Sequence, residues 1–435
     1  MAETREFAAS IGQRLLWLMD RYRGSAGALN EPMTWRLRGP LDIGALSAAV
    51  DALIERHESL RTAFLMRDNQ LLQVIKPPVS AGLAPETVCS GAGEQEVLAA
   101  LEAETGSRID IGEGPLRIRL WRLSPTDHIL CLNIHHLAMD RRSATVIADE
   151  LAMLYSGAEL PPSGWQYAAW AEWQRDRMSG TRLAELRHAW TDRLQDVQVP
   201  ALRQVSEAAP GAGPEPDCVL GERQVSGLQR LAADVSAGLF AVTLAMFFAL
   251  IWARTGVREP AVASVFDGRD RPEVADTVGF FEHLVLLRAS VRADQPMTDL
   301  IAAAQAEIDF AAANGLPLHL LPPAAARLGG PDGARRIDDV VFSHIVCLDE
   351  PVEFSGLRLD HVPVSLERTE ERFGLRVLFA EYPGQLVGMF HCAPKVMPSW
   401  AAGFGGVFSR LADELVERPS ATVGRTTLGA GLRRV

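Results

Sequence analysis

The sequence predicts an α+β protein of two lobes, each built as a sandwich of helices on a sheet. With 435 residues the chain is long for one hydrophobic core, so two domains of roughly 200 residues each are expected. Helix-like and strand-like segments mix without a regular βαβ rhythm, which argues against a doubly wound parallel sheet. We expect an N-terminal lobe over 1–177 and a C-terminal lobe over 178–435, with a flexible Pro/Gly/Ala-rich joint near 208–216.

The first half alternates between the two hydrophobic periodicities. The helix expected over Ile43–His57 follows a proline and repeats apolar residues at helical spacing. The other helices are expected at Gly12–Arg21, Glu94–Thr105 and Ala144–Tyr155. The strands are expected at Met33–Arg38, Thr62–Phe64, Gln70–Val74, Leu116–Arg122 and His128–His136.

The second half repeats this mixture and ends in a polar segment. Helices are expected at Ser163–Arg177 and Thr181–Leu194, in the stretch between the two halves. In the second half they are expected at Val225–Ala233, Leu239–Thr255, Met297–Ala313 and Ser399–Glu417. Strands are expected at Ala261–Asp267, Leu284–Val291, Val340–Cys347, Leu375–Phe379 and Gln385–His391. The tail 418–435 is polar, and we expect it to be mobile.

Composition excludes several functional classes. A formal net charge of −12 argues against a nucleic-acid surface, because phosphate binding needs a concentrated basic field. The N-terminus lacks an apolar signal core, and no apolar run approaches the roughly 20 residues of a membrane span. The five cysteines are scattered through apolar runs, which indicates reduced core residues rather than disulfides or a metal site. We therefore expect a cytoplasmic protein that binds neither nucleic acid nor membrane. We also expect a monomer.

Two adjacent histidines, His135 and His136, end the apolar run that starts at Ile129, and Asp140 follows four places on. Side chains alternate along a strand, so the two histidines point in opposite directions, and no nearby Cys, Glu or third His completes a metal set. A neutral imidazole that titrates near pH 7 suits a general base acting on an amine or hydroxyl. Because no G-x-S-x-G nucleophile turn accompanies it, direct acyl transfer is favoured over a covalent acyl-enzyme.

The motif alone leaves two interpretations open. His136 is either a base in a cleft or a satisfied core histidine, with about equal weight. Asp140 either caps the following helix or pairs with an arginine to hold the loop. Arg141 and Arg142 stand near the start of that helix and oppose its dipole, which predicts a compensating acid nearby.

Several motifs in order resemble the condensation domains of nonribosomal peptide synthetases, members of the chloramphenicol-acetyltransferase-like superfamily. Arg56–Phe64 matches R-H-E-x-L-R-T-x-F without a gap, and His135–Arg141 matches H-H-x-x-x-D-G except at its last position. Ser10–Trp17 is similar to S-x-A-Q-x-R-L-W, and Gln166–Trp170 is similar to the end of Y-x-D-Y-A-x-W. Gly268-Arg269 and Val278–Arg288 resemble the G-R…V-G-x-F-V-N-T-L-P-L-R region, with His283 at the asparagine.

The resemblance implies two chloramphenicol-acetyltransferase-like lobes arranged in a V, with a tunnel running between them past the histidine motif. An acyl-loaded carrier protein would deliver the donor thioester on its phosphopantetheine arm. The acceptor would be carrier-bound or a free small molecule. No cofactor would be bound permanently, and no metal is implied.

The resemblance also implies roles for individual residues. His136 aligns with the catalytic histidine and His135 with the supporting one, while Asp140 aligns with a structural aspartate whose expected salt-bridge partner is Arg61. Ser343 falls where the family often lines the tunnel with a small polar residue. Arg141 replaces a glycine beside the base, where it would either narrow the tunnel or bind a carboxylate of an unusual acceptor.

These roles indicate a stand-alone condensation enzyme that forms an amide or an ester in nonribosomal peptide or hybrid polyketide biosynthesis. One alternative is a coenzyme-A-dependent acyltransferase of the same superfamily, although Arg372–Leu375 only faintly echoes the D-F-G-W-type motif of those enzymes. The other is a non-catalytic recruitment module, which the arginine at position 141 keeps open.

Overall fold

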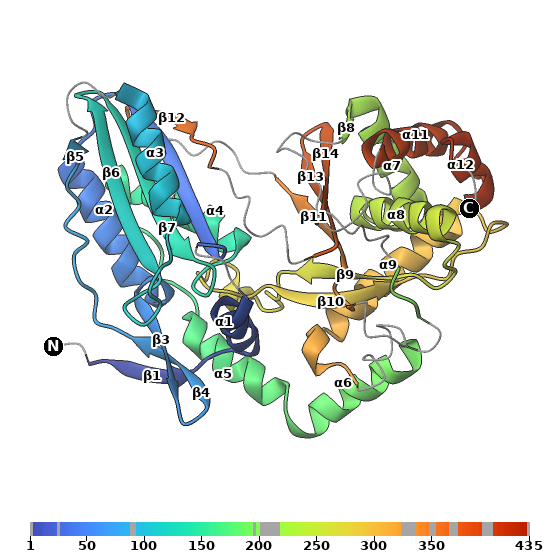
Figure 1. Cartoon of the computed structure of the whole chain (residues 1–435), viewed down its shortest axis with the longest axis horizontal. Coiled ribbons are helices and arrows are strands. Elements are labelled where there is room, and N and C mark those ends of the chain that lie inside the picture. The colour runs from blue at the N-terminus through green and yellow to red at the C-terminus, as the bar shows by residue number, and fades with distance from the viewer. Residues whose placement is uncertain are drawn as a thin grey trace. The chain divides into compact units, whose positions relative to one another are not determined.

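A computed structural model describes residues 3–23, 27–87, 93–194, 197–200, 218–322, 336–347, 354–364, 373–393 and 403–432. The chain divides into two compact units (Figure 1). Unit 1 comprises Met1–Ser179, Asp267–Glu282 and Asp349–Thr369, and unit 2 comprises Gly180–Phe266, His283–Leu348 and Glu370–Val435. Each unit contains both helices and sheet, so the predicted α+β class is confirmed.

The main sheet of unit 1 has, among the described residues, five strands in the order β12-β2-β7-β6-β5. Their bounds are Arg358–His361 (β12), Asn30–Arg38 (β2), Asp127–His135 (β7), Leu116–Ser124 (β6) and Glu86–Thr87 (β5). The central strand β7 pairs antiparallel with both neighbours, with Asn30 opposite His135 and Leu116 opposite Ile134. The end of β7 is therefore held on both sides.

The strand β7 sends alternate side chains into two apolar clusters, because successive strand residues face opposite sides of a sheet. Leu130, Leu132 and Ile134 pack with buried residues of α2 (Ile43–Arg56) and α4 (Arg141–Tyr155). On the opposite face, Ile129 and Cys131 pack with Val97 and Leu101 of α3 (Gly93–Gly106). The predicted alternation along this strand is confirmed as far as Ile134.

A second, smaller sheet of unit 1 lies in the order β1-β4-β3 in the described part of the chain. The remaining elements of unit 1 are β1 (Arg5–Ala8), α1 (Ile11–Arg23), η1 (Glu58–Arg61), β3 (Thr62–Arg67), β4 (Gln70–Ile75), α5 (Tyr167–Arg177) and η2 (Pro272–Val274). Phe64 and Leu71 of this sheet pack with Leu16, Leu137 and Phe280. This cluster places the loop after β7 against the segment that ends at residue 282.

Unit 2 contains, in its described residues, a six-stranded sheet in the order β10-β9-β11-β13-β14-β8. The strands are β8 (Cys218–Leu220), β9 (Ala261–Phe266), β10 (His283–Arg288), β11 (Val340–Val346), β13 (Leu375–Tyr382) and β14 (Gln385–Cys392). β11 runs parallel to both β9 and β13, and the other pairs are antiparallel. The helices are α6 (Gly180–Arg193), α7 (Glu222–Asp234), α8 (Leu239–Thr255), α9 (Met297–Ala313), η3 (Leu318–Leu320), α11 (Phe404–Glu417) and α12 (Val423–Gly429).

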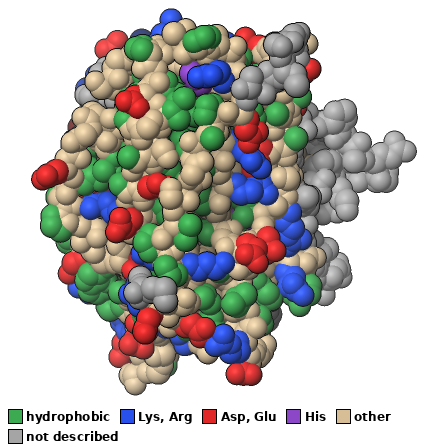
Figure 2. Space-filling view, turned by 90° about the vertical axis from the view of Figure 1, so that its left-hand side faces the viewer, with side chains coloured by type: hydrophobic (Ala, Val, Ile, Leu, Met, Phe, Trp, Pro, Cys, Tyr) green, Lys and Arg blue, Asp and Glu red, His purple; other side chains and the backbone are tan. Residues whose placement is uncertain are grey.

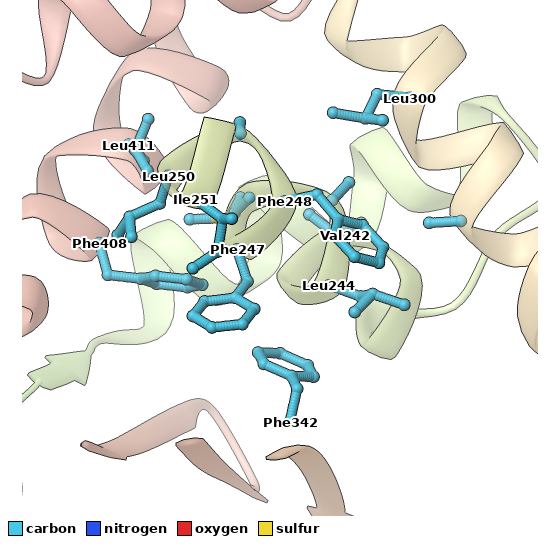
Figure 3. Close-up of a cluster of buried hydrophobic side chains, with 14 of the residues drawn as sticks. Val242, Leu244, Phe247, Phe248, Leu250, Ile251, Leu300, Phe342, Phe408 and Leu411 are labelled. Carbon is cyan, nitrogen blue, oxygen red and sulfur yellow. The ribbon is translucent and has the colours of Figure 1, made fainter. Parts of the chain in front are cut away.

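The helix α8 lies inside the core of unit 2. Its residues are apolar all round, as expected of a helix surrounded by protein rather than one lying on a surface. Figure 3 shows Phe247 and Phe248 pointing to different sides of the helix, with Phe342 and Leu300 among the side chains around them. No single described helix is long and apolar enough to cross a membrane; α7 and α8 meet the length and composition test only as a pair bent by 98°.

The face of the molecule shown in Figure 2 carries acidic, basic and apolar side chains interspersed with one another. Neither sign of charge gathers into a broad patch on this face. The net charge of −12 is therefore not displayed there as one extended acidic field.

The predicted division into two continuous lobes is wrong in its detail. The first segment of unit 1 ends at Ser179, close to the expected boundary, but Asp267–Glu282 and Asp349–Thr369 return to unit 1. The second return supplies β12, which pairs with β2 from more than 300 residues earlier, with His361 opposite Trp35. The expected joint at 208–216 lies outside the described residues.

The expectation of a mobile tail is also wrong for its described part. Residues 423–429 form α12, and the side chain of Thr422 caps this helix by accepting a hydrogen bond from the Arg425 N–H. Val423, Ala430 and Leu432 are buried in the core of unit 2. A few apolar residues at suitable spacing anchor a segment whose overall composition is polar.

Candidate active site

The two adjacent histidines are fixed at the end of the central strand of unit 1. β7 ends at His135, and residues 136–140 connect it to α4. The His135 N–H donates to the carbonyl oxygen of Pro115 at 2.8 Å, and the His136 N–H donates to that of Leu29 at 2.8 Å. Backbone bonds to neighbouring segments therefore position both residues.

One ring nitrogen of His136 is bound to the backbone. Nδ1 lies 2.8 Å from the carbonyl oxygen of Met139, and because a carbonyl only accepts, Nδ1 carries the hydrogen of the neutral ring. Nε2 then keeps its lone pair and lies 3.8 Å from Oε2 of Glu282. The ring of Phe280 meets the imidazole edge-on at a centroid distance of 4.9 Å. The His136 side chain is 20% exposed, so it is not sealed in the core.

Nearby carboxylates raise the pKa of the His136 imidazole. Burial lowers the pKa of His136, but the negative charges of Glu31 and Glu282 outweigh burial, so its pKa is raised above the ordinary 6.5. Burial also raises the pKa of Glu282, and the neighbouring imidazole opposes that effect. The ring therefore loses its second proton, and becomes able to act as a general base, at a higher pH than an ordinary histidine.

His135 has the opposite environment. Its ring is buried, and its Nδ1 accepts a hydrogen bond from the Leu137 N–H at 3.1 Å. Burial, with smaller contributions from the charges of His136 and Arg108, lowers the pKa of His135 to about 3. His135 is therefore neutral at physiological pH and stabilises the loop rather than exchanging protons.

Asp140 is the N-cap of α4 and the centre of a buried network. Its Oδ1 accepts hydrogen bonds from the backbone N–H and the hydroxyl of Ser143, at 2.8 and 2.7 Å. The same oxygen accepts from Arg269 Nη2 at 2.7 Å, and Oδ2 accepts from the Phe281 N–H at 3.1 Å. Both predicted roles of Asp140, helix cap and arginine partner, are confirmed.

The predicted partner, Arg61, is wrong. Arg61 donates to the carbonyl oxygens of Ile54 and Lys76 and lies 3.8 Å from Glu58, whereas Arg269 occupies the position beside Asp140. Arg61 therefore stabilises the 3₁₀ turn before β3 through hydrogen bonds to nearby backbone carbonyls. The Gly268-Arg269 dipeptide stands out in the sequence, but nothing local to it indicates a partner 129 residues away.

Glu282, whose Oε2 lies 3.8 Å from Nε2 of His136, was not predicted from the sequence. Its Oε1 accepts a hydrogen bond from the Arg141 N–H at 3.4 Å, at the start of α4. A helix N-terminus favours a negative charge, so this contact helps to fix the carboxylate. One signal was available: Glu282 is a charged residue directly before β10, where the family motif V-G-x-F-V-N has valine.

The compensating acids expected near Arg141 and Arg142 are present. Glu282 accepts from the Arg141 backbone, and Arg142 Nη2 lies 2.9 Å from Asp276 Oδ1. The predicted contact of the Arg141 side chain with a substrate remains a prediction. Ser343, the other predicted substrate-lining residue, lies in β11 of unit 2, where it is buried opposite Leu378.

Aromatic packing fixes the segment that carries Arg269 and Glu282. The Tyr167 hydroxyl donates to the carbonyl oxygen of Phe280 at 2.5 Å, and the rings of Tyr167 and Trp170 pack on Phe281. A Cβ on Gly279 would lie 2.0 Å from Cδ2 of Tyr167, so only glycine fits there. The motif residues around Tyr167 thus hold the segment before Glu282 in place.

The first motif of the chain supports the histidine loop directly. Gln13 Nε2 donates to the carbonyl oxygen of Leu137 at 3.0 Å. Ser10 and Gln13 also bond to each other's backbone N–H groups, which fixes the start of α1. Among the described residues, no group of three or more His, Cys, Asp or Glu side chains is arranged to hold a metal ion.

Comparison with known proteins points to one family. Residues 3–332 match the family model described as Condensation domain. The chain is 28% identical over 454 residues to the nonribosomal peptide synthetase kk1B of Curvularia clavata, covering 97% of this chain and 3% of that protein. It is 30% identical over 294 residues to tyrocidine synthase 2 of Brevibacillus parabrevis, covering 66% of this chain and 8% of that protein. The chain therefore spans only a small part of the length of such relatives.

Two solved structures agree in fold. The first condensation domain of the CDA synthetase has a TM-score of 0.72 at 19% identity, covering 97% of this chain and 98% of that chain. The X-domain, in its complex with OxyB from teicoplanin biosynthesis, has a TM-score of 0.77 at 22% identity, covering 97% and 96%. At these identities the similarity establishes the shared fold alone. Any inference about activity has to come from the residues of the site.

Proposed function

The chain belongs to the condensation-domain family of nonribosomal peptide synthetases, and from this premise we propose that it transfers an acyl group from a carrier-bound thioester to an amine or hydroxyl acceptor. The product is an amide or an ester in the biosynthesis of a nonribosomal peptide or a peptide–polyketide hybrid. The observation that carries this proposal is the state of His136. Its Nδ1 is bound to Met139, and its Nε2 retains a lone pair beside a partly exposed carboxylate.

His136 acts in this proposal as the proton acceptor for the attacking group. The acceptor nitrogen or oxygen attacks the thioester carbonyl carbon while Nε2 removes its proton. The carbon–sulfur bond then breaks, and the proton passes from Nε2 to the departing thiolate. The hydrogen bond from Nδ1 to the Met139 carbonyl stabilises the imidazolium that forms between these steps.

The donor arrives as a substrate of the enzyme, on the phosphopantetheine arm of an acyl-loaded carrier protein. The acceptor is either carrier-bound or a free small molecule. The buried network of Asp140 and Arg269 keeps the loop rigid, so the base is in place before either substrate binds. Such positioning lowers the entropic part of the barrier.

A second candidate function is recruitment of another protein without catalysis. The X-domain shares this fold, and its solved complex with OxyB shows a partner protein bound to such a domain. Arg141, in place of the glycine of the H-H-x-x-x-D-G motif, favours this candidate. The intact His136, with a lone pair on Nε2, favours the enzyme.

Transfer from a loaded carrier tests the proposal. The purified chain is incubated with an acyl-loaded carrier protein and a panel of amine and hydroxyl acceptors, and loss of the acyl group is followed by intact-protein mass spectrometry. We expect transfer from the carrier and none from acyl-coenzyme A. Replacing His136→Ala should slow transfer by about 10²–10⁴-fold, the usual contribution of a general base.

A matched histidine provides the control. His188 is exposed on α6 of unit 2, so His188→Ala should transfer at the wild-type rate. Equal rates for wild type and His136→Ala would remove His136 from the mechanism. No transfer by the wild-type chain with any carrier would favour recruitment instead.

A further inference from the structure

The carboxylate of Glu282 faces the same imidazole nitrogen that the proposed reaction uses. Nδ1 of His136 is already hydrogen-bonded to the Met139 carbonyl, so Glu282 does not orient the ring through that nitrogen. Its Oε2 instead lies 3.8 Å from Nε2, the ring nitrogen that is not bound to Met139. The Arg141 N–H holds the other carboxylate oxygen. In the proposed reaction the attacking group lies next to Nε2, so Glu282 lies beside that group as well.

The separation leaves room for one bridging atom. A direct hydrogen bond needs about 2.7–3.2 Å, so Nε2 and Oε2, which are 3.8 Å apart, are not hydrogen-bonded to each other. An atom at about 2.9 Å from each of them satisfies both acceptors at once. Both side chains are partly exposed, 20% for His136 and 23% for Glu282.

Two acceptors side by side suit an attacker with more than one hydrogen. A neutral primary amine carries two N–H groups and its ammonium form three, whereas an alcohol carries one O–H. An amine therefore bonds to His136 and Glu282 together, and an alcohol leaves one of them without a partner. Unpaired polar groups of this kind are a strong source of discrimination between substrates.

The surrounding charge agrees with a cationic amine. Glu31 adds a second carboxylate whose field reaches both His136 and Glu282. The nearby acid Asp140 is already neutralised by Arg269 at 2.7 Å. The V-G-x-F-V-N motif has valine at position 282, so this carboxylate is one of the positions at which the chain departs from the motif, and it brings charge next to Nε2 of His136.

We propose that Glu282 determines acceptor specificity, binding a primary amine next to Nε2 of His136 and selecting amide over ester formation. This inference rests on the proposed acyl transfer. The amine binds as its ammonium ion against Glu282 and releases one proton to solvent. The neutral nitrogen then attacks the thioester carbon, its second proton passes through Nε2 to the leaving sulfur, and amide and thiol are the products.

Matched acceptors test the inference. The probes are 2-phenylethylamine and 2-phenylethanol, and the proteins are wild type, Glu282→Val and Glu282→Gln. Valine fits the apolar neighbours of this position, and glutamine keeps the shape without the charge. Binding is followed by the ring-nitrogen NMR shifts of His136, which need no turnover, and transfer is followed from an acyl-loaded carrier.

We expect the wild type to bind the amine about 10- to 100-fold more tightly than the alcohol, as for loss of a hydrogen bond to a charged group. Glu282→Val should lose that preference by weakening amine binding, and it should not weaken alcohol binding, because valine leaves no acceptor unpaired. Equal binding of the two probes by wild type, or an unchanged preference in Glu282→Val, overturns this inference. Failure of the proposed reaction is separate, because it would appear as His136→Ala matching wild type in transfer.

Discussion

The buried ion pair between Asp140 and Arg269 constrains the end of the histidine loop. We predict that Arg269→Leu destabilises the protein, because it leaves the Asp140 carboxylate inside unit 1 without a counter-charge. The side chains of Asp140 and Arg269 are 1% and 5% exposed, and their atoms are 2.7 Å apart. Arg269 also donates to the carbonyl oxygens of Val274 and Thr277, and both bonds would be lost.

The size of the effect follows from this burial. Removing one partner of a buried pair costs about 3–5 kcal/mol, since the other charge stays desolvated. Asp140→Asn removes the charge but keeps a residue that caps helices well. In the double variant the two losses overlap, so we expect a coupling energy of about 1.5–3 kcal/mol between positions 140 and 269.

Urea unfolding measures these energies. Tryptophan emission is followed together with circular dichroism, because Trp170 packs on Phe281 at 4.5 Å and reports on this region. The matched control replaces Arg61→Leu, alone and with Asp140→Asn. Arg61 bonds to backbone carbonyl oxygens rather than to Asp140, so that pair should be additive within about 0.5 kcal/mol.

Either of two results would refute this explanation of the loop. One is a coupling below about 0.5 kcal/mol between Asp140 and Arg269. The other is a coupling between Asp140 and Arg61 as large as that between Asp140 and Arg269.

Three further predictions concern packing, the tail and pH. Gly279→Ala should cost about 1–3 kcal/mol in unfolding free energy, because the new Cβ overlaps the Tyr167 ring; a cost below about 0.5 kcal/mol in urea unfolding would contradict this close packing. Removing residues 419–435 deletes α12 from the core of unit 2 and should lower the melting temperature in calorimetry, whereas an unchanged melting temperature would show that α12 contributes nothing. The reaction needs neutral Nε2, so its rate should rise with pH through the raised pKa of His136, with a midpoint above about 6.5. In Glu282→Val one carboxylate that raises this pKa is gone, so the midpoint should move to lower pH; a midpoint unchanged in the pH–rate profile would mean that Glu282 does not act on the base.

The sequence was sufficient to place the histidine strand and its flanking helices. Strand alternation specifies strongly which face is buried, and Leu130, Leu132 and Ile134 do share one cluster while Ile129 and Cys131 share another. The helix α4 begins where Asp140 predicts a cap. These features depend on neighbours in sequence, so local patterns carry them.

The remaining features depend on partners that are distant in sequence. Arg269 reaches Asp140 and Glu282 reaches His136 from a segment that leaves β9 and returns to unit 1 before β10. No local periodicity indicates such a return. β12 was missed for the same reason, because a four-residue strand is defined by its pairing with β2 rather than by its own composition.

The proposed reaction depends most on one step, in which Nε2 of His136 accepts the proton of the attacking group. Single-turnover kinetics test it most directly, with wild type and His136→Ala mixed separately with the same acyl-loaded carrier and a saturating acceptor. We predict a rate constant at least about 100-fold lower for His136→Ala, with its dependence on pH near neutrality lost. An equal rate constant, or a pH dependence that survives the substitution, would contradict this role of the imidazole.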